Sequence, residues 1–191
     1  MAVKPILFNT EMVRAILDGR KDATRRIVKG FIPNDAVWGY TAFTPKGYIS
    51  CRGTFADGYG EKFFKLPCEP GNILYVRETW KKAPNGYYYY EDWQKNVIAD
   101  ITKWKPSIHM PKEAARIWLK VTDVKVERLQ NITEDGSKAE GAIDNRGFIH
   151  FSDDEYDRIH TAREHFIEIW NSTIKKSDFE RYSWDTSPWV W

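Results

Sequence analysis

Cysteines and long apolar runs are the features this sequence has least of. Its 191 residues include two cysteines, Cys51 and Cys68, which fit neither a CxxC spacing nor a disulfide framework and so favour a reducing compartment. No apolar run approaches the ~20 residues that span a bilayer. Lys4 and Pro5 precede only Ile6–Phe8, which is too short for a signal peptide. We therefore expect a cytoplasmic protein with no membrane partner.

Several functional motifs are also missing. No GxGxxG, P-loop or GxSxG element occurs, so nucleotide-cofactor chemistry and α/β-hydrolase chemistry are unsupported. His160 and His165 are five positions apart on a predicted helix and cannot share a face as ligands four apart would, while His150 is isolated. The sequence therefore predicts no metal site and no cofactor.

The net charge is small, at +2, although 29% of the residues are charged, so a grip on DNA by the whole surface is not expected. The charge is uneven, because residues 1–30 carry seven Lys/Arg against three acids. Such a local excess attracts phosphate or carboxylate groups. Aromatic residues make up 15% of the chain and include nine tryptophans, which supply a core and flat side chains for stacking on bases.

Local patterns predict the first elements in some detail. A strand at residues 5–8 precedes a helix that Asn9 or Thr10 caps, with apolar residues at helical spacing over 12–17. Gly19 is predicted to end this helix in the left-handed conformation.

The rest of the chain alternates short strands with a few helices. Many strands with two or three helices predict an α+β fold around a mixed or barrel-like sheet, and the length suits one domain. The predicted elements are a strand beginning at 27–28, hairpins over 30–68, strands at 73–77 and 87–90, a bulged strand over 116–126, a short helix from Thr133 through Glu140, and a helix over 153–171 started by a capping box of Ser152 and Glu155.

The segment after the first predicted helix is the main candidate for a functional site. A threonine hydroxyl becomes a nucleophile only when a base takes its proton, and a lysine can be that base only if its pKa falls. Burial and neighbouring cations both favour such a fall. The alternative is a basic loop that meets the dipole of a helix C-terminus. The segment combines four cations with one hydroxyl: Arg20, Lys21, Arg25, Arg26 and Thr24.

Two further segments carry candidate groups. Arg77, Glu78 and Trp80 stand where a predicted strand ends, a frequent place for site residues, but an edge ion pair over a half-buried indole explains them equally well. Ser107 and His109 combine a hydroxyl and an imidazole in a proline-bounded loop. A lone histidine in a loop is more often a surface or capping residue.

Six segments, spread over nearly the whole chain in a fixed order, resemble ASCH domains, relatives of the PUA fold, and within them a group common in bacteria and their phages. These segments are 6–9 with the helix that follows, 19–26, 71–80, 105–111, 124–141 and 188–191.

The resemblance implies a PUA-like β-barrel with flanking helices and a cleft lined by the Gly-Arg-Lys turn. It implies one domain over residues 1–191, with long insertions around 30–68 and 80–106. Small bacterial ASCH proteins include amidohydrolases that remove the acetyl group from N(4)-acetylcytidine, which points to the cytoplasm of a bacterial host cell.

The resemblance also assigns roles to residues. Carried over by motif, the catalytic lysine, threonine and glutamate become Lys21, Thr24 and Glu140, with Glu134 as the competing acid. The residues expected to bind the substrate are Arg20, Arg25, Arg26, Tyr75, Arg77, Glu78, Trp80, Ser107 and His109.

The chain departs from the family pattern at two positions near these groups. Asp22 replaces the usual threonine after the lysine, and its carboxylate favours the protonated form of Lys21. Gly136 lies inside the short helix before Glu140 and weakens it by up to ~1 kcal/mol relative to alanine.

Two functions follow as expectations. The first is a metal-independent amidohydrolase acting on an acylated pyrimidine nucleoside such as N(4)-acetylcytidine. The second is a phage-encoded module that binds single-stranded or modified RNA, with a ribonuclease as its variant.

Overall fold

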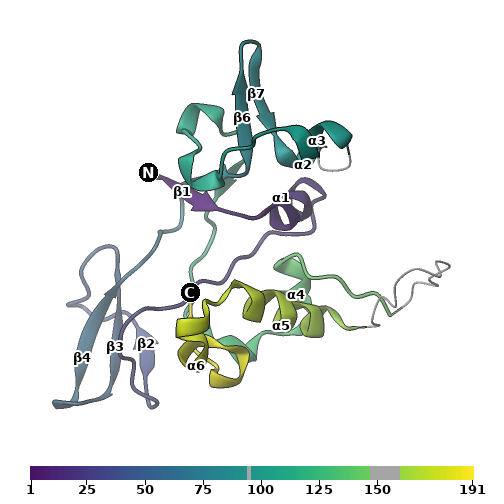
Figure 1. The fold of residues 1–191 in the computed structure, drawn as a ribbon. Helices are drawn as coiled ribbons and strands as arrows, with labels where there is room; N and C mark the ends of the chain where they lie inside the picture. Colours follow the sequence, from purple (N-terminus) through teal and green to yellow (C-terminus); the bar gives the residue numbers. More distant parts are fainter. Residues whose placement is uncertain (94–95, 147–159) are drawn as a thin grey trace. The chain divides into compact units, whose positions relative to one another are not determined.

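A computed structural model of the chain describes residues 1–93, 96–146 and 160–191 (Figure 1). The chain divides into two compact units, each built from segments that are distant in the sequence. The first unit contains residues 1–21 and 68–124, and the second contains residues 22–67 and 125–191. Within the described ranges, no helix has both the length and the apolar character needed to cross a membrane.

A three-stranded sheet with one helix forms the centre of the first unit. Strand β1 (Val3–Leu7) pairs in parallel with β5 (Ile73–Arg77), and β5 pairs antiparallel with β8 (Trp118–Lys120). Helix α1 (Thr10–Leu17) buries Val13 against the strands in a small apolar core, because its apolar residues recur at helical spacing. The buried residues of this core are Phe8, Val13, Val76 and Ile117.

Both ends of α1 follow from the local sequence. The side chain of Asn9 accepts a hydrogen bond from the amide of Met12 at 2.8 Å and caps the N-terminus. Gly19 has a φ of +71°, the left-handed region that favours glycine, and turns the chain back across the last turn. The amides of Arg20 and Lys21 consequently donate to the carbonyl of Ala15 at 2.8 and 3.0 Å. The predicted cap and stop are both confirmed.

The first unit also holds a hairpin and several short helices. The hairpin and the segments after it surround a second apolar core of Trp80, Met110 and Ala114. The elements are β6 (Trp80–Ala83), β7 (Gly86–Tyr89), α2 (Tyr90–Trp93), α3 (Val97–Ile101), η1 (Ser107–His109) and η2 (Lys112–Ala114).

The second unit contains an antiparallel sheet in the order β2-β3-β4, formed by β2 (Val37–Gly39), β3 (Tyr48–Phe55) and β4 (Gly58–Lys65). Figure 1 shows β3 and β4 as a long hairpin, as predicted for residues 30–68. Trp38 on β2 packs edge-on against Trp189 and Trp191, with ring centroids 5.7 and 6.2 Å apart. These contacts join the sheet to the C-terminal segment.

Helices surround the main core of the second unit. Its buried residues are Leu129, Ile132, Ala142, Ala162, Phe166, Trp170 and Val190. The elements are β9 (Glu127–Arg128), η3 (Leu129–Asn131), α4 (Glu134–Ala139), α5 (Ala162–Thr173), η4 (Lys176–Asp178), α6 (Phe179–Tyr182), η5 (Trp184–Thr186) and β10 (Trp189–Val190), which pairs antiparallel with β9.

The α+β class is confirmed, but in the described part of the chain the strands form four small sheets and no closed barrel. The predicted bulged strand over 116–126 is wrong: β8 ends at Lys120, and the next strand begins at Glu127. The change of parity after Asp123 marks the place where the chain leaves the first unit at Val124.

The long C-terminal helix begins later than predicted. Residues 160 and 161 are not helical, and α5 starts after Thr161, whose hydroxyl accepts from the amide of Glu164 at 3.0 Å. The Glu164 side chain accepts from the amide of Thr161, which completes a capping box. The capping box predicted for Ser152 and Glu155 lies outside the described residues.

Replacing Phe166 by alanine tests the core of the second unit. Phe166 is 4% exposed, so its loss should lower the free energy of unfolding by about 3–5 kcal/mol through lost burial and a cavity. Phe43 in the same unit is 83% exposed, and its replacement by alanine should cost less than about 0.5 kcal/mol. Urea denaturation of the two variants measures both values, and equal losses would contradict the assignment of this core.

Candidate functional site

Lys21 is held in place by the end of α1. Its amide donates to the carbonyl of Ala15 at 3.0 Å, and its ammonium lies 5.4 Å from the centre of the Phe8 ring in the same unit. The residue is 6% exposed. A lysine with so little solvent contact is unusual, since lysines are almost never fully buried unless they are paired. The structure therefore distinguishes Lys21 from an ordinary surface cation.

The chain after Lys21 is fastened to the end of α4 within the second unit. The amides of Asp22 and Ala23 both donate to the carbonyl of Ala139, at 2.9 and 3.0 Å. Glu140 directly follows Ala139 as the C-cap of α4. The segment that carries Thr24 therefore runs alongside the predicted catalytic acid, and the Asp22 residue is exposed.

Arg25 joins two carboxylates in this region. Its Nε and Nη2 donate to one oxygen of Glu127 at 2.9 and 2.7 Å, and its Nη1 donates to Glu140 at 3.3 Å. Glu140 is 8% exposed, so the guanidinium compensates a carboxylate that has lost most of its water. The charge of Arg25 is thus paired with carboxylates inside the second unit, where it positions Glu140.

Thr24 and Arg26 form a close pair. Nη1 of Arg26 donates to the hydroxyl oxygen of Thr24 at 2.8 Å and to the carbonyl of Arg25 at 2.9 Å. Desolvation lowers the pKa of Arg26, and the negative charge of Glu140 opposes this shift. Arginine stays protonated in proteins, so the threonine oxygen faces a permanent cation. A cation at this place stabilises negative charge that develops on the hydroxyl oxygen.

Glu134 has a structural role that separates it from Glu140. Its two carboxylate oxygens accept from the amides of Ala162 and Arg163 at 2.7 and 3.3 Å, at the start of α5. A carboxylate at a helix N-terminus satisfies unpaired amides and interacts favourably with the helix dipole. The contacts of Glu134 thus explain it as a cap, whereas Glu140 bonds to the segment that carries Thr24.

Tyr75 and Arg77 are brought together at the end of β5 in the first unit. The guanidinium of Arg77 donates to the Tyr75 hydroxyl at 3.3 Å and to the carbonyl of Ile108 at 3.2 Å. Ile108 lies between the two other candidates of this region, Ser107 and His109, in the short helix η1. These four predicted substrate-binding residues therefore belong to one neighbourhood.

Glu78 is buried in an ion-pair network of the first unit. It is 2% exposed and accepts from Nε and Nη2 of Arg116 at 2.9 and 2.8 Å, while Nη1 of Arg116 contacts Asp92 at 2.8 Å. Burial raises the pKa of Glu78, and the hydrogen bonds from Arg116 partly offset this shift. Desolvation would lower the pKa of Arg116, but its hydrogen bonds to Glu78 and Asp92 outweigh that effect and raise it. The network explains Glu78 as a structural group.

The contacts described for Trp80 and Arg20 are packing and an ion pair within the protein. Trp80 is buried and packs with Met110, Ala114 and Tyr87 in the second core of the first unit. Its indole is therefore covered by protein rather than presented to a base. Arg20 is exposed and pairs with Asp18 at 3.0 Å.

The structure describes both cysteines and two of the histidines that the sequence analysis considered as metal ligands. Both thiols are free, and burial, together with the charge of Asp35, raises the pKa of Cys51 to about 11. His160 precedes α5 instead of lying on it, and its ring is 4.7 Å from that of His165. Among the described residues, no group of three His, Cys, Asp or Glu is arranged to hold a metal ion.

Sequence reasoning missed the partners of the candidate residues. Glu127, which holds Arg25, lies 102 positions away in the chain, and Arg116, which holds Glu78, lies 38 positions away. No local pattern indicates such pairs. The one available signal for Glu127 is its place inside segment 124–141, which carries part of the family resemblance.

The chain was compared with models of protein families, with curated proteins and with solved structures, and none of the three comparisons gave a match.

Replacing Arg25 by alanine should lower the free energy of unfolding by about 3 kcal/mol, because it removes the guanidinium that bonds the buried carboxylate of Glu140 and the carboxylate of Glu127. Arg52→Ala is the matched control: it removes an exposed arginine of the same unit and should cost less than about 1 kcal/mol. Chemical denaturation of both variants gives the comparison. If both variants lost the same stability, the buried ion pair would not have the importance described.

Proposed function

We propose that the chain is a metal-independent amidohydrolase that removes an acyl group from an acylated pyrimidine nucleoside such as N(4)-acetylcytidine. The observation that carries the proposal is the hydrogen bond from the Arg26 guanidinium to the Thr24 hydroxyl oxygen, at 2.8 Å. A permanent cation at this oxygen favours the negative charge that a nucleophile must develop.

Four residues are assigned to the reaction. Lys21 takes the proton from the Thr24 hydroxyl, whose oxygen attacks the acyl carbonyl carbon. The carbon–nitrogen bond then breaks, and the nucleoside amine leaves with a proton. Water hydrolyses the threonine ester and releases the carboxylic acid. Glu140 orients the reacting groups and relays protons, and Arg26 with main-chain donors stabilises the oxyanion.

Two features of the described residues support these assignments. Lys21 is almost withdrawn from water, and burial is one of the conditions under which a lysine can act as a base. Glu140 is held by Arg25 in the same unit as Thr24, and the competing acid Glu134 is engaged as the cap of α5. The membership of the ASCH family and the PUA-like barrel belong to the same proposal and rest on the sequence segments given above.

A direct assay tests the proposal. The purified chain should release cytidine from N(4)-acetylcytidine, and chromatography measures the product. Lys21→Ala and Thr24→Ala should each lower the rate at least ~100-fold, because each removes a group that acts in the transition state. Thr24→Ser keeps a hydroxyl and should retain measurable activity. Lys29→Ala removes an exposed lysine of the same region and should stay within about twofold of the unchanged chain.

Melting temperatures of all variants separate loss of the reaction from loss of the fold. If the unchanged, folded chain released no more cytidine than Lys21→Ala, this substrate would be excluded.

A second candidate is a module that binds single-stranded or modified RNA. It is favoured by the excess of cations in residues 1–30, which carry seven Lys/Arg against three acids. Binding of short RNA that weakens steeply with salt, in a chain that releases no cytidine, would favour this function. Cleavage of that RNA without added metal would identify the ribonuclease variant.

A further inference from the structure

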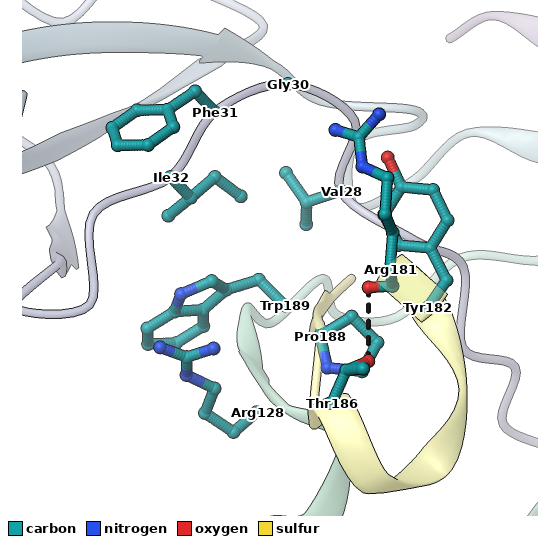
Figure 2. Close-up of a pocket in the computed structure, with 10 residues that line it drawn as sticks. All are labelled: Val28, Gly30, Phe31, Ile32, Arg128, Arg181, Tyr182, Thr186, Pro188 and Trp189. Atoms are coloured by element: carbon teal, nitrogen blue, oxygen red, sulfur yellow. Dashed lines mark hydrogen bonds between the residues drawn. The ribbon is translucent and has the colours of Figure 1, made fainter. Parts of the chain in front are cut away.

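A pocket of about 250 Å³ lies in the second unit, outside the residues assigned to the reaction (Figure 2). Backbone pairing fixes its walls. Ile27 forms a β-bridge with Val190, the amide of Val28 donates to the carbonyl of Trp189 at 2.9 Å, and the amide of Leu129 donates to the carbonyl of Pro188 at 2.9 Å. The pocket is lined by Val28, Gly30, Phe31, Ile32, Arg128, Arg181, Tyr182, Thr186, Pro188 and Trp189.

The wall of the pocket is apolar and partly aromatic. Figure 2 shows Val28, Ile32, Pro188 and the indole of Trp189 around the hollow. Aliphatic and aromatic surfaces of this kind bind a flat organic ring by excluding water and by stacking. The pocket therefore suits a ligand with a flat, largely apolar part.

Arg128 is a preorganised cation on one side of the pocket. Its guanidinium carbon lies 4.4 Å from the centre of the Trp189 ring, and its Nη1 donates to the carbonyl of Ser187 at 3.1 Å. Ser187 has a φ of +43°, a left-handed conformation that costs free energy for a residue other than glycine. This backbone turn places the carbonyl that holds the guanidinium.

Arg181 supplies a second cation on the opposite side. Its guanidinium carbon lies 5.4 Å from the centre of the Tyr182 ring, which also lines the pocket (Figure 2), and its carbonyl accepts from the Thr186 hydroxyl at 3.1 Å. Within the described ranges, neither Arg181 nor Arg128 forms an ion pair with a carboxylate, although Glu180 and Asp185 are close to Arg181 in the sequence. Two uncompensated guanidinium groups beside an apolar hollow indicate an anionic ligand.

We propose that this pocket binds one nucleotide, with its base against the apolar wall and its phosphate on Arg181, while Arg128 adds positive charge from the other side. Arginine matches phosphate oxygens in a bidentate geometry, and aromatic side chains stack on bases. The volume of about 250 Å³ is below the ~300–1,000 Å³ of pockets that hold drug-sized ligands, so the pocket admits no ligand larger than a single nucleotide. The nucleotide is either a free nucleoside monophosphate or one residue of a single strand. The proposal does not depend on the deacylation reaction.

Calorimetric titration of the full chain tests the pocket. The probes are cytidine 5′-monophosphate, cytidine, inorganic phosphate and a single-stranded RNA of five cytidine nucleotides. The monophosphate should bind one molecule per chain, and cytidine and phosphate should each bind at least about tenfold more weakly, because each lacks one half of the recognised chemistry. The RNA identifies the source: tighter binding than the monophosphate indicates a strand, and equal or weaker binding indicates the free nucleotide.

Matched arginine variants assign the binding to this pocket. Arg181→Gln removes the exposed cation and should weaken binding of the monophosphate about tenfold. Arg163→Gln is the control, since Arg163 also packs on a tryptophan of this unit, at 4.9 Å from Trp184, but does not line the pocket. Ile32→Trp fills the hollow and should abolish binding. It tests the pocket independently of any change that Arg181→Gln makes to the surface.

Three results would overturn the proposal. They are no binding of the monophosphate or the RNA at millimolar concentration, equal binding of phosphate and monophosphate, and an unchanged affinity in both Arg181→Gln and Ile32→Trp.

Discussion

The carbonyl of Ala139 accepts two amides, from Asp22 and Ala23, and this double hydrogen bond is the constraint on which the candidate site depends. It fastens the segment after Lys21 to the C-terminal end of α4, next to Glu140. Arg25 reinforces the connection by bonding Glu140 and Glu127 from the same segment. The positions of the hydroxyl, the acid and the arginines of the second unit therefore follow from one short stretch of backbone and one guanidinium.

Helix α4 takes part in three connections although it is only six residues long. Its N-terminus is capped by Thr133, its Glu134 caps α5, and its C-terminus receives the segment 22–26. Gly136 permits this arrangement, because a Cβ at that position would lie 3.1 Å from the Ile132 side chain and 3.4 Å from Nη2 of Arg25. The glycine that weakens the helix by propensity thus relieves crowding against the Ile132 side chain one turn before it.

In each unit an arginine of the same unit compensates a buried carboxylate. Arg116 compensates the buried Glu78 in the first unit, and Arg25 compensates the buried Glu140 in the second. Buried ion pairs of this kind contribute little net stability, but losing one partner is costly, because a charge is left without water or a counter-ion. Arg128 and Arg181 differ from these arginines, since among the described residues they face an apolar hollow without a carboxylate. Ion pairs within the fold therefore explain the first two arginines, whereas the other two are suited to bind a ligand.

Features with a local physical cause could be predicted from the sequence. The cap at Asn9, the stop at Gly19, strand β5 and the cap at Thr133 all follow from residues within a few positions of one another. A continuous helix over 153–171 was wrong because residues 160 and 161 are not helical, and α5 begins at the capping box of Thr161 and Glu164, a second match to the same pattern that the sequence analysis did not single out.

The partners of the candidate residues could not be predicted. Lys21 and Thr24 were identified from their cationic segment and Glu140 from a family resemblance. The bonds of Arg25 to Glu127 and of Glu78 to Arg116, however, join distant segments. The nucleotide pocket was missed for the same reason, because its lining comes from residues 28–32, from Arg128 and from the C-terminal segment. Such contacts depend on tertiary packing, which leaves no periodic signal in the sequence.

Hydrogen exchange at the amides of Asp22 and Ala23, followed by NMR, tests the central claim most directly. The account predicts that both amides exchange at least ~100-fold more slowly than in an unfolded chain, because each is bonded to Ala139 in the folded state. Exchange of both amides at the unfolded rate, in a protein whose α5 amides remain protected, would contradict the account.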